Sequence, residues 1–186
     1  MRTLSGIVLI AATAATVFAA SSAEAEERVC RGTIGARTLD NVRVPQGATC
    51  NLDGTYVEGT VKVETGATVR AIDVRVIGNV QAEGAVRVVV RGSSRIGGSI
   101  QIVQGGAAKI VNNRIGGDIL LDEQDRYLTA NRNVVGGSLQ AFQNAGGLEI
   151  RKNRIDGNLQ CKENRPAPVG GGNIVQGNKE DQCRTL

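Results

Sequence analysis

The stretch that decides the fold is Val76-Ile77-Gly78-Asn79-Val80-Gln81-Ala82, which reads apolar-x-Gly-polar-apolar-x-apolar. Similar stretches recur along the chain with their glycines 19 or 20 residues apart, at Gly59, Gly78, Gly98, Gly117, Gly137, Gly157 and Gly177. A degenerate copy, Leu39 to Val44, precedes them. A fixed period of this length is typical of proteins built from stacked repeats.

Two short strands are expected in each period. Apolar residues alternate with outward-facing ones after each glycine, as in Val61-Lys62-Val63, and again about eight residues later, as in Val88-x-Val90. A unit of about 20 residues cannot bury its own apolar face, so the units must stack. We therefore predict an all-β, single-domain parallel β-helix of about eight rungs over residues 26–186. Its right hand follows from the general preference of parallel crossovers.

Polar residues recur four positions before the repeat glycine, at Ser94, Asn113, Asn133, Asn153 and Asn173. Stacked Asn side chains can hydrogen-bond from rung to rung, and Asn tolerates left-handed backbone at a turn. Asn is also common in turns of every kind, but the fixed spacing favours a ladder. The alignment resembles the asparagine ladder of right-handed parallel β-helix proteins.

The rungs from Thr55 to about Asn178 are also similar in pattern to those of the bactofilins. Bactofilins are polymer-forming scaffold proteins that face the cytoplasm. The resemblance implies the architecture and carries over no functional residue. It also raises end-to-end polymerisation as an alternative role for this chain.

The first 25 residues have the layout of a secretory signal peptide. Arg2 gives a charged start, Gly6 to Ala20 is an apolar run, and Ala23-Glu24-Ala25 is a cleavage site of the A-x-A type. The apolar run is shorter than the roughly 20 residues that span a bilayer, and no later segment is long enough. We predict a secreted or periplasmic protein without a transmembrane helix.

Four Cys in an exported chain indicate two disulfides. Cys30 and Cys50 are 20 residues apart, and Cys161 and Cys183 are 22 apart, so each pair spans about one rung. Neighbouring rungs place equivalent Cα atoms about 4.8 Å apart, which a disulfide accepts. We predict Cys30–Cys50 and Cys161–Cys183, one at each end of the rod.

The composition excludes several classes of activity. The chain has no His and no Trp, its aromatic content is 2%, and its net charge is +4. Histidine-based catalysis is therefore excluded, and too few aromatic rings are present to stack nucleic-acid bases. No cofactor or metal signature occurs, so we expect no cofactor and no nucleic-acid partner.

An arginine column lies three residues before the repeat glycine and is interrupted at Val134. It comprises Arg75, Arg95, Arg114 and Arg154. Stacked about 5 Å apart, these side chains repel one another, which favours an anionic partner such as an acidic polysaccharide or an envelope component. The alternative is a solvated face neutralised by nearby acids, which the small net charge favours.

The acidic cluster Asp118, Asp122, Glu123 and Asp125, next to Arg126, is the best place to seek an active site. Lyases built on β-helices bind Ca²⁺ through carboxylates, and oxygen ligands suit that ion. A Ca²⁺-assisted polysaccharide lyase or hydrolase is thus one hypothesis, and a solvated acidic loop is its alternative. The even rung spacing leaves no insertion to wall a cleft. The sequence therefore favours a non-enzymatic structural or binding role in the envelope or outside the cell.

Overall fold

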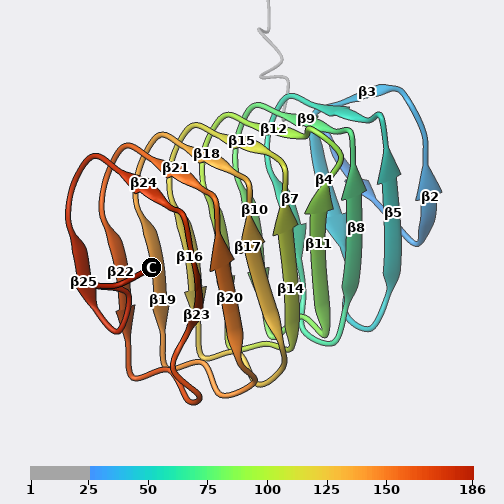
Figure 1. The fold of residues 1–186 in the computed structure, drawn as a ribbon. Coiled ribbons are helices and arrows are strands. Elements are labelled where there is room, and N and C mark those ends of the chain that lie inside the picture. Colours follow the sequence, from blue (N-terminus) through green and yellow to red (C-terminus); the bar gives the residue numbers. More distant parts are fainter. Residues whose placement is uncertain (1–25) are drawn as a thin grey trace, which may run out of the picture.

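The computed structural model describes residues 26–186, so the predicted signal peptide, residues 1–25, lies outside the described residues. The described chain forms 25 strands and no helix. The strands wind into a rod of about eight turns (Figure 1). Its front strands run upward, the chain passes back over the top, and each turn advances toward the C-terminal end, so the solenoid is right-handed.

Each turn contributes one strand to each of three parallel sheets. Sheet A consists of β1 (Glu27–Val29), β4 (Asn41–Val44), β7 (Val61–Val63), β10 (Val80–Glu83), β13 (Ile100–Val103), β16 (Ile119–Asp122), β19 (Leu139–Phe142), β22 (Leu159–Lys162) and β25 (Lys179–Asp181). Sheet B consists of β2 (Gly32–Ile34), β5 (Thr49–Asp53), β8 (Thr68–Ile72), β11 (Arg87–Arg91), β14 (Ala107–Val111), β17 (Leu128–Asn131), β20 (Leu148–Arg151) and β23 (Val169–Gly171). Sheet C consists of β3 (Thr38–Leu39), β6 (Tyr56–Val57), β9 (Arg75–Val76), β12 (Arg95–Ile96), β15 (Arg114–Ile115), β18 (Val134–Val135), β21 (Arg154–Ile155) and β24 (Ile174–Val175).

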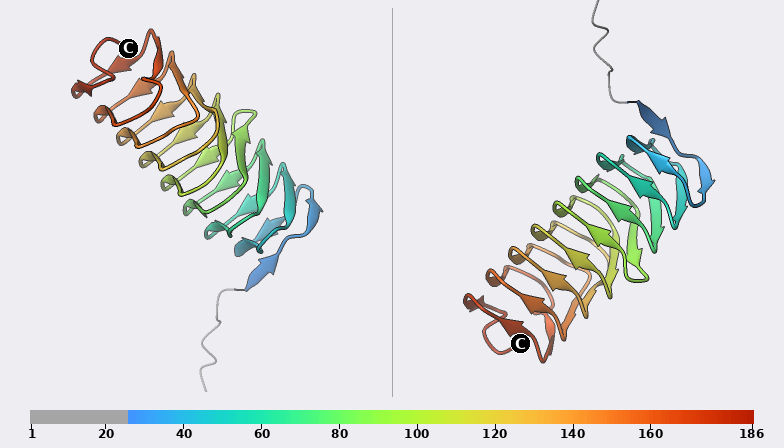
Figure 2. Two further views of the ribbon diagram at one scale, coloured as in Figure 1. Left: turned by 90° about the horizontal axis from the view of Figure 1, so that it is seen from below. Right: turned by 90° about the horizontal axis from the view of Figure 1, so that it is seen from above.

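The core is a stack of aliphatic side chains in register. Val80 of β10 pairs with Val61 on one side and Ile100 on the other, and all three are at most 1% exposed. The same alternation buries one face of sheets B and C, so each rung fills the space between three strands. The predicted β-helix with its period of about 20 residues is confirmed. Figure 2 shows how evenly the rungs stack along the rod.

The predicted asparagine ladder is present at the corner between sheets B and C. Asn133 Nδ2 donates to Asn153 Oδ1 at 3.1 Å, and Asn153 Nδ2 donates to Asn173 Oδ1 at 3.0 Å. Each amide also donates to a main-chain carbonyl 23 residues earlier in the chain. The expectation that the Asn itself takes the left-handed conformation is wrong. The residue before it does so instead, as at Arg132 (φ 55°) and Lys152 (φ 55°), which frees the Asn side chain to point inward.

A second buried ladder, which the sequence interpretation missed, occupies the corner between sheets A and B. Asn144 Nδ2 donates to Asn164 Oδ1 at 2.7 Å, and Asn164 Nδ2 donates to Gln182 Oε1 at 3.0 Å. In each ladder the first side-chain amide has a buried oxygen that has no hydrogen-bond partner among the described residues. These oxygens are Asn113 Oδ1 and Gln124 Oε1. The rung before each places Ser94 or Gly105 there, so no side-chain amide extends either ladder.

A third column of polar side chains explains why glycine recurs in each rung. Its members stand one position after the repeat glycine. The N–H of Ser99 donates to Asn79 Oδ1 at 2.8 Å, and the N–H of Ser138 donates to Asp118 Oδ1 at 2.7 Å. The same bond joins neighbouring rungs along this column: Asn41, Thr60, Asn79, Ser99, Asp118, Ser138, Asn158 and Asn178. A Cβ on Gly98 or Gly137 would collide with the accepting oxygen of the preceding rung.

The predicted cysteine pairs are confirmed, and each links two neighbouring rungs at one end of the rod. Cys30 and Cys50 are bonded with Cα atoms 5.5 Å apart, and Cys161 and Cys183 with Cα atoms 5.2 Å apart. After β25 the chain turns back, and Leu186 packs onto the core with 8% of its surface exposed. The C-terminal tail therefore lies across the last rung (Figure 1).

Candidate anion-binding surface

The arginine column lies on the outer face of sheet C. Arg95 of β12 is paired in register with Arg75 of β9 and with Arg114 of β15. Val134 continues the column and is followed by Arg154. The adjacent inward residues Val76, Ile96, Ile115 and Ile155 are at most 2% exposed. Because these neighbours are locked in the core, strand alternation directs the arginines to solvent.

None of the four arginines forms an ion pair within residues 26–186. Arg75 instead lies over the ring of Tyr56, with its guanidinium carbon 5.2 Å from the ring centre. All four side chains are exposed. Like charges in directly opposed positions of neighbouring strands destabilise a sheet by a few tenths of a kcal/mol or more. A bound anion would relieve this repulsion.

Charge is strongly segregated around the rod. Sheets B and C, with the turns that join them, form what we term the basic side. This side carries twelve basic residues, Arg37, Arg70, Arg75, Arg87, Arg91, Arg95, Lys109, Arg114, Arg132, Arg151, Lys152 and Arg154, and three acidic residues, Asp53, Asp73 and Glu149. The other described residues include nine basic and fourteen acidic ones. The small net charge therefore conceals a rod with one strongly positive side.

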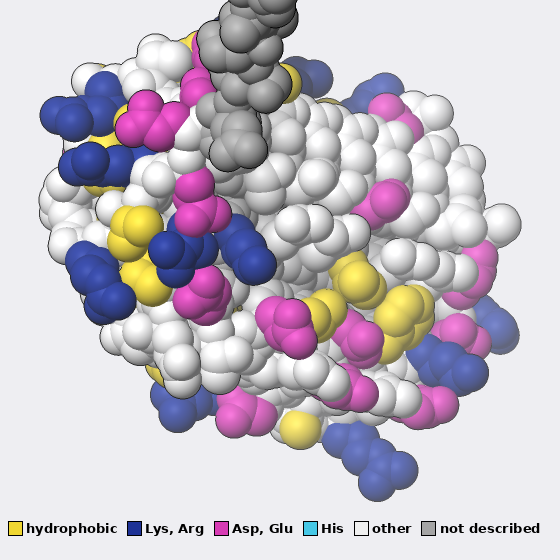
Figure 3. Space-filling model, turned by 180° about the vertical axis from the view of Figure 1, so that it is seen from behind, with side chains coloured by type: hydrophobic (Ala, Val, Ile, Leu, Met, Phe, Trp, Pro, Cys, Tyr) yellow, Lys and Arg dark blue, Asp and Glu magenta, His cyan; other side chains and the backbone are white. Residues whose placement is uncertain are grey.

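Figure 3 shows the opposite side of the rod, over sheet A. Acidic side chains are spread along much of its length, and basic side chains gather mainly toward its two ends. The positions of these acidic side chains test the alternative that nearby acids neutralise the arginine column. Asp40, Glu58 and Asp156 directly follow strands of sheet C, but no described acid forms an ion pair with the four arginines, so neutralisation by nearby acids stays an alternative without a direct contact.

The residues of the proposed acidic cluster are divided by a strand. Asp118 precedes β16 and Asp122 ends it, which separates them by about 13 Å along the strand. The Asp118 carboxylate accepts the Ser138 N–H, so it belongs to the column that follows the glycines. Asp125 lies in the next turn, 3.9 Å from Arg126. Within residues 26–186 no three His, Cys, Asp or Glu side chains converge to hold a metal ion.

Burial raises the pKa of the Asp122 carboxyl above its ordinary value, and the neighbouring Glu123 charge adds to the rise. Asp122 faces the outer surface of sheet A beside Phe142, with which it is paired in register. The raised pKa of Asp122 is thus explained by its partly buried position on the surface of sheet A and by the adjacent Glu123.

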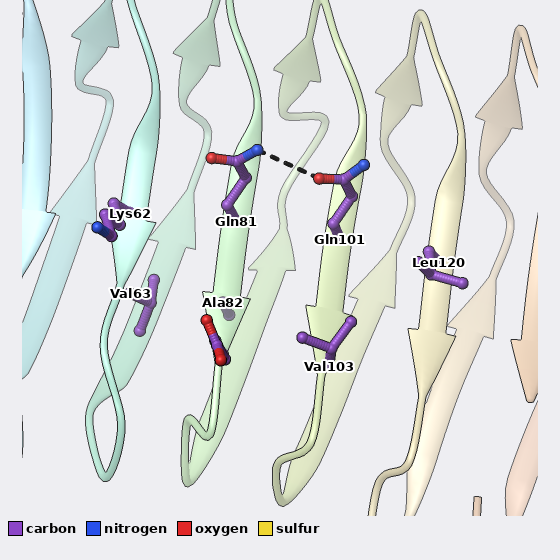
Figure 4. Close-up of a pocket in the computed structure, with 8 residues that line it drawn as sticks. Lys62, Val63, Gln81, Ala82, Gln101, Val103 and Leu120 are labelled. Atoms are coloured by element: carbon purple, nitrogen blue, oxygen red, sulfur yellow. Dashed lines mark hydrogen bonds between the residues drawn. The ribbon is translucent and has the colours of Figure 1, made fainter. Parts of the chain in front are cut away.

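The outer face of sheet A carries a shallow hollow of about 360 Å³, shown in Figure 4. Lys62, Gln81, Gln101 and Leu120 point outward from successive strands along it. Gln81 Nε2 donates to Gln101 Oε1 at 3.2 Å, and Gln140 and Gln160 repeat this contact at 2.9 Å. The sequence predicts that these outward glutamines, together with the arginine column, form a contact surface; in the structure they bond to one another along the rod.

No protein-family model matches this chain, and no curated protein or solved structure is significantly similar to it. No helix in the described part of the chain is long and apolar enough to cross a membrane. The arginine column and the charge segregation are the features of the described chain that point most directly to a function.

Proposed function

We propose that this chain is a non-enzymatic, secreted or periplasmic β-solenoid that binds an anionic polysaccharide along its basic side. The observation that carries the proposal is the arginine column. Arg75, Arg95 and Arg114 stand on three consecutive rungs, exposed and outside any ion pair of the described residues. A rigid row of guanidinium groups suits a polymer that repeats carboxylate or sulfate groups along its length.

The two disulfides support the proposed location outside the cytoplasm, because such bonds persist in oxidising compartments. The uniform rod supports a binding role, since its turns carry no long insertion that would enclose a reacting substrate and exclude water from it. The likeness of the rungs to bactofilins supports a scaffold. End-to-end polymerisation is disfavoured, because the tail with Leu186 covers the C-terminal end of the core.

Binding of the purified chain to immobilised polygalacturonate and dextran sulfate tests the proposal, with neutral dextran as the control. We expect retention on both acidic polymers and none on neutral dextran. Raising the ionic strength should release the protein, because salt screens exposed charges beyond about 10 Å at 0.1 M. Equal retention on neutral dextran, or none on either acidic polymer, would overturn the proposal.

A further inference from the structure

A second cationic surface lies on sheet B, on a different face from the arginine column. There a groove of about 730 Å³ is lined by ten residues. Four of them are basic, Arg70, Arg87, Lys109 and Arg126, and none is acidic. Thr68, Thr129 and Tyr127 add hydroxyl groups. We term this the sheet B groove.

A small side chain opens the groove. Arg87 at the start of β11 is paired in register with Ala107 at the start of β14. Tyr127 stands at the equivalent place on the next rung, since Ala108 pairs with Leu128. Ala107 therefore leaves a gap between two large side chains, an arginine on one rung and a tyrosine two rungs further along the rod.

A longer turn builds one wall of the groove. On the earlier rung, two residues, Gly106 and Ala107, separate the corner residue Gly105 from the buried Ala108 of β14. The following rung has three, from Asp125 to Tyr127. The extra residue lets Arg126 and Tyr127 stand out from the sheet, and Tyr127 is 52% exposed.

The Tyr127 ring is held in place by a bond at its far end. Its hydroxyl donates to Glu149 Oε2 at 3.2 Å. Glu149 also accepts from Asn131 at 3.1 Å and pairs with Arg151 at 2.7 Å. The Glu149 carboxylate that holds the ring is thus already paired with Arg151, and the ring presents a fixed apolar face. A preformed site loses less conformational entropy when a ligand binds.

The basic side chains of the groove are available to a ligand. Arg70, Arg87 and Lys109 form no ion pair within residues 26–186, and Arg126 has only a 3.9 Å contact with Asp125 in which both side chains are largely exposed. Its volume falls in the usual range of small-ligand sites, about 300–1,000 Å³.

We propose that the sheet B groove binds a short acidic oligosaccharide, with two or more carboxylate or sulfate groups on the basic side chains and a sugar ring against Tyr127. The cationic lining stands independently of the arginine column, whereas the choice of saccharides as ligand rests on the proposed function. Arginine and lysine both pair with such anions, and an amphipathic aromatic ring suits a partner with one apolar face.

Titration of the chain with trigalacturonate and with sucrose octasulfate, followed by calorimetry and backbone amide shifts, tests the proposal. Neutral maltotriose is the control ligand. We expect shifts centred on Arg87, Lys109 and Tyr127, and Arg87→Glu with Lys109→Glu should weaken binding at least about tenfold. Arg75→Glu with Arg114→Glu, the same charge change on sheet C, should weaken it less than about twofold.

The proposal is overturned if neither acidic ligand binds below about 10 mM, if maltotriose binds equally well, or if the two variants lose affinity equally. Binding of sucrose octasulfate alone supports a sulfated ligand, and binding of trigalacturonate alone supports a carboxylated one. If long polymers fail to bind but the short acids do, the proposed function fails and the groove stands.

Discussion

Gly98 has no side chain because the carboxamide of Asn79, one rung earlier, occupies the place that a Cβ would take. That carboxamide accepts the N–H of Ser99 at 2.8 Å. The two residues therefore act as one unit, in which a polar side chain of one rung is seated over the glycine of the next. The relation recurs along the rod and accounts for the period of glycines in the sequence.

Gly98→Ala should accordingly destabilise the rod by about 2 kcal/mol, in the usual range for an added group in a packed site. Gly35→Ala is the matched control, because a Cβ there would meet no atom within 4 Å. Urea unfolding followed by circular dichroism measures both. In a double-mutant cycle, Asn79→Ala should lessen the cost of Gly98→Ala. Equal stability of the two alanine variants would contradict this account.

Ser94→Asn should stabilise the protein by about 1 kcal/mol, the typical value for one buried hydrogen bond. The new amide would extend the first ladder and donate to Asn113 Oδ1, which is buried and unpaired in the described chain. Ser94→Ala should act in the opposite direction, because Ser94 Oγ accepts the N–H of Val74 at 3.1 Å. Melting temperatures of the two variants test the signs, and a loss of stability in Ser94→Asn would show that the ladder cannot be extended.

The Glu149 carboxylate gives the stability a specific pH dependence. Burial pushes its pKa upward, but bonds from Asn131, Tyr127 and Arg151 outweigh that effect and lower the pKa below its ordinary value. A lowered pKa contributes stability that is present above the unfolded-state pKa and is lost as the pH falls through the folded-state pKa. Glu149→Gln should thus lower the melting temperature at pH 7, and the difference should shrink in acid.

The matched control for that experiment is Glu83→Gln, an exposed glutamate at the end of β10 that forms no ion pair with the described residues. Its effect should be small at every pH. A destabilisation of Glu149→Gln that stays constant between neutral and acidic pH would show that shape, and not charge, explains the loss.

The covered C-terminal end predicts that the chain does not polymerise end to end. Light scattering of the intact chain should show no species that grows with concentration. A variant that ends at Asp181 and carries Cys161→Ser exposes the last rung and its sheet edges, and exposed edges pair with other chains. We expect that variant to form larger species as its concentration rises. Filaments of the intact chain would contradict the prediction and would favour the polymer role.

Calcium should leave the stability unchanged, because β16 holds Asp118 and Asp122 about 13 Å apart. A melting curve with and without millimolar Ca²⁺ measures this, since any ligand that binds only the folded state raises the melting temperature. A clear rise with Ca²⁺ would return the lyase hypothesis to consideration.

Most of the fold could be predicted from the sequence because its period is visible in the residues themselves. The register of Val61, Val80 and Ile100 follows directly from the glycine spacing. The second ladder left the same kind of signal, since Gln124, Asn144 and Asn164 each lie seven residues after a repeat glycine. The second ladder could therefore have been predicted from spacing in the same way as the first. The left-handed residue before each Asn could not, because the preference of Asn for turns does not say which residue of the turn is left-handed.

The surface was harder to predict than the core. The positions of Arg75, Arg95 and Arg114 on one column follow from the period, but their freedom from acidic partners depends on which turn each acid occupies in three dimensions. The sheet B groove depends on Ala107 meeting a turn that is one residue longer on the next rung. A change of one residue in a turn appears in the sequence only as a spacing of 20 in place of 19.

The central claim is that the basic side binds acidic polysaccharide through the arginine column, and charge reversal tests it most directly. Arg95→Glu with Arg114→Glu is compared with Lys62→Glu with Lys162→Glu, which makes the same change in net charge on the opposite side. The measurement is the dissociation constant for polygalacturonate and for dextran sulfate, after circular dichroism has shown that both variants are folded. We predict at least about tenfold weaker binding for the arginine pair and less than about twofold for the lysine pair. Equal losses, or unchanged binding of the arginine pair, would contradict the claim.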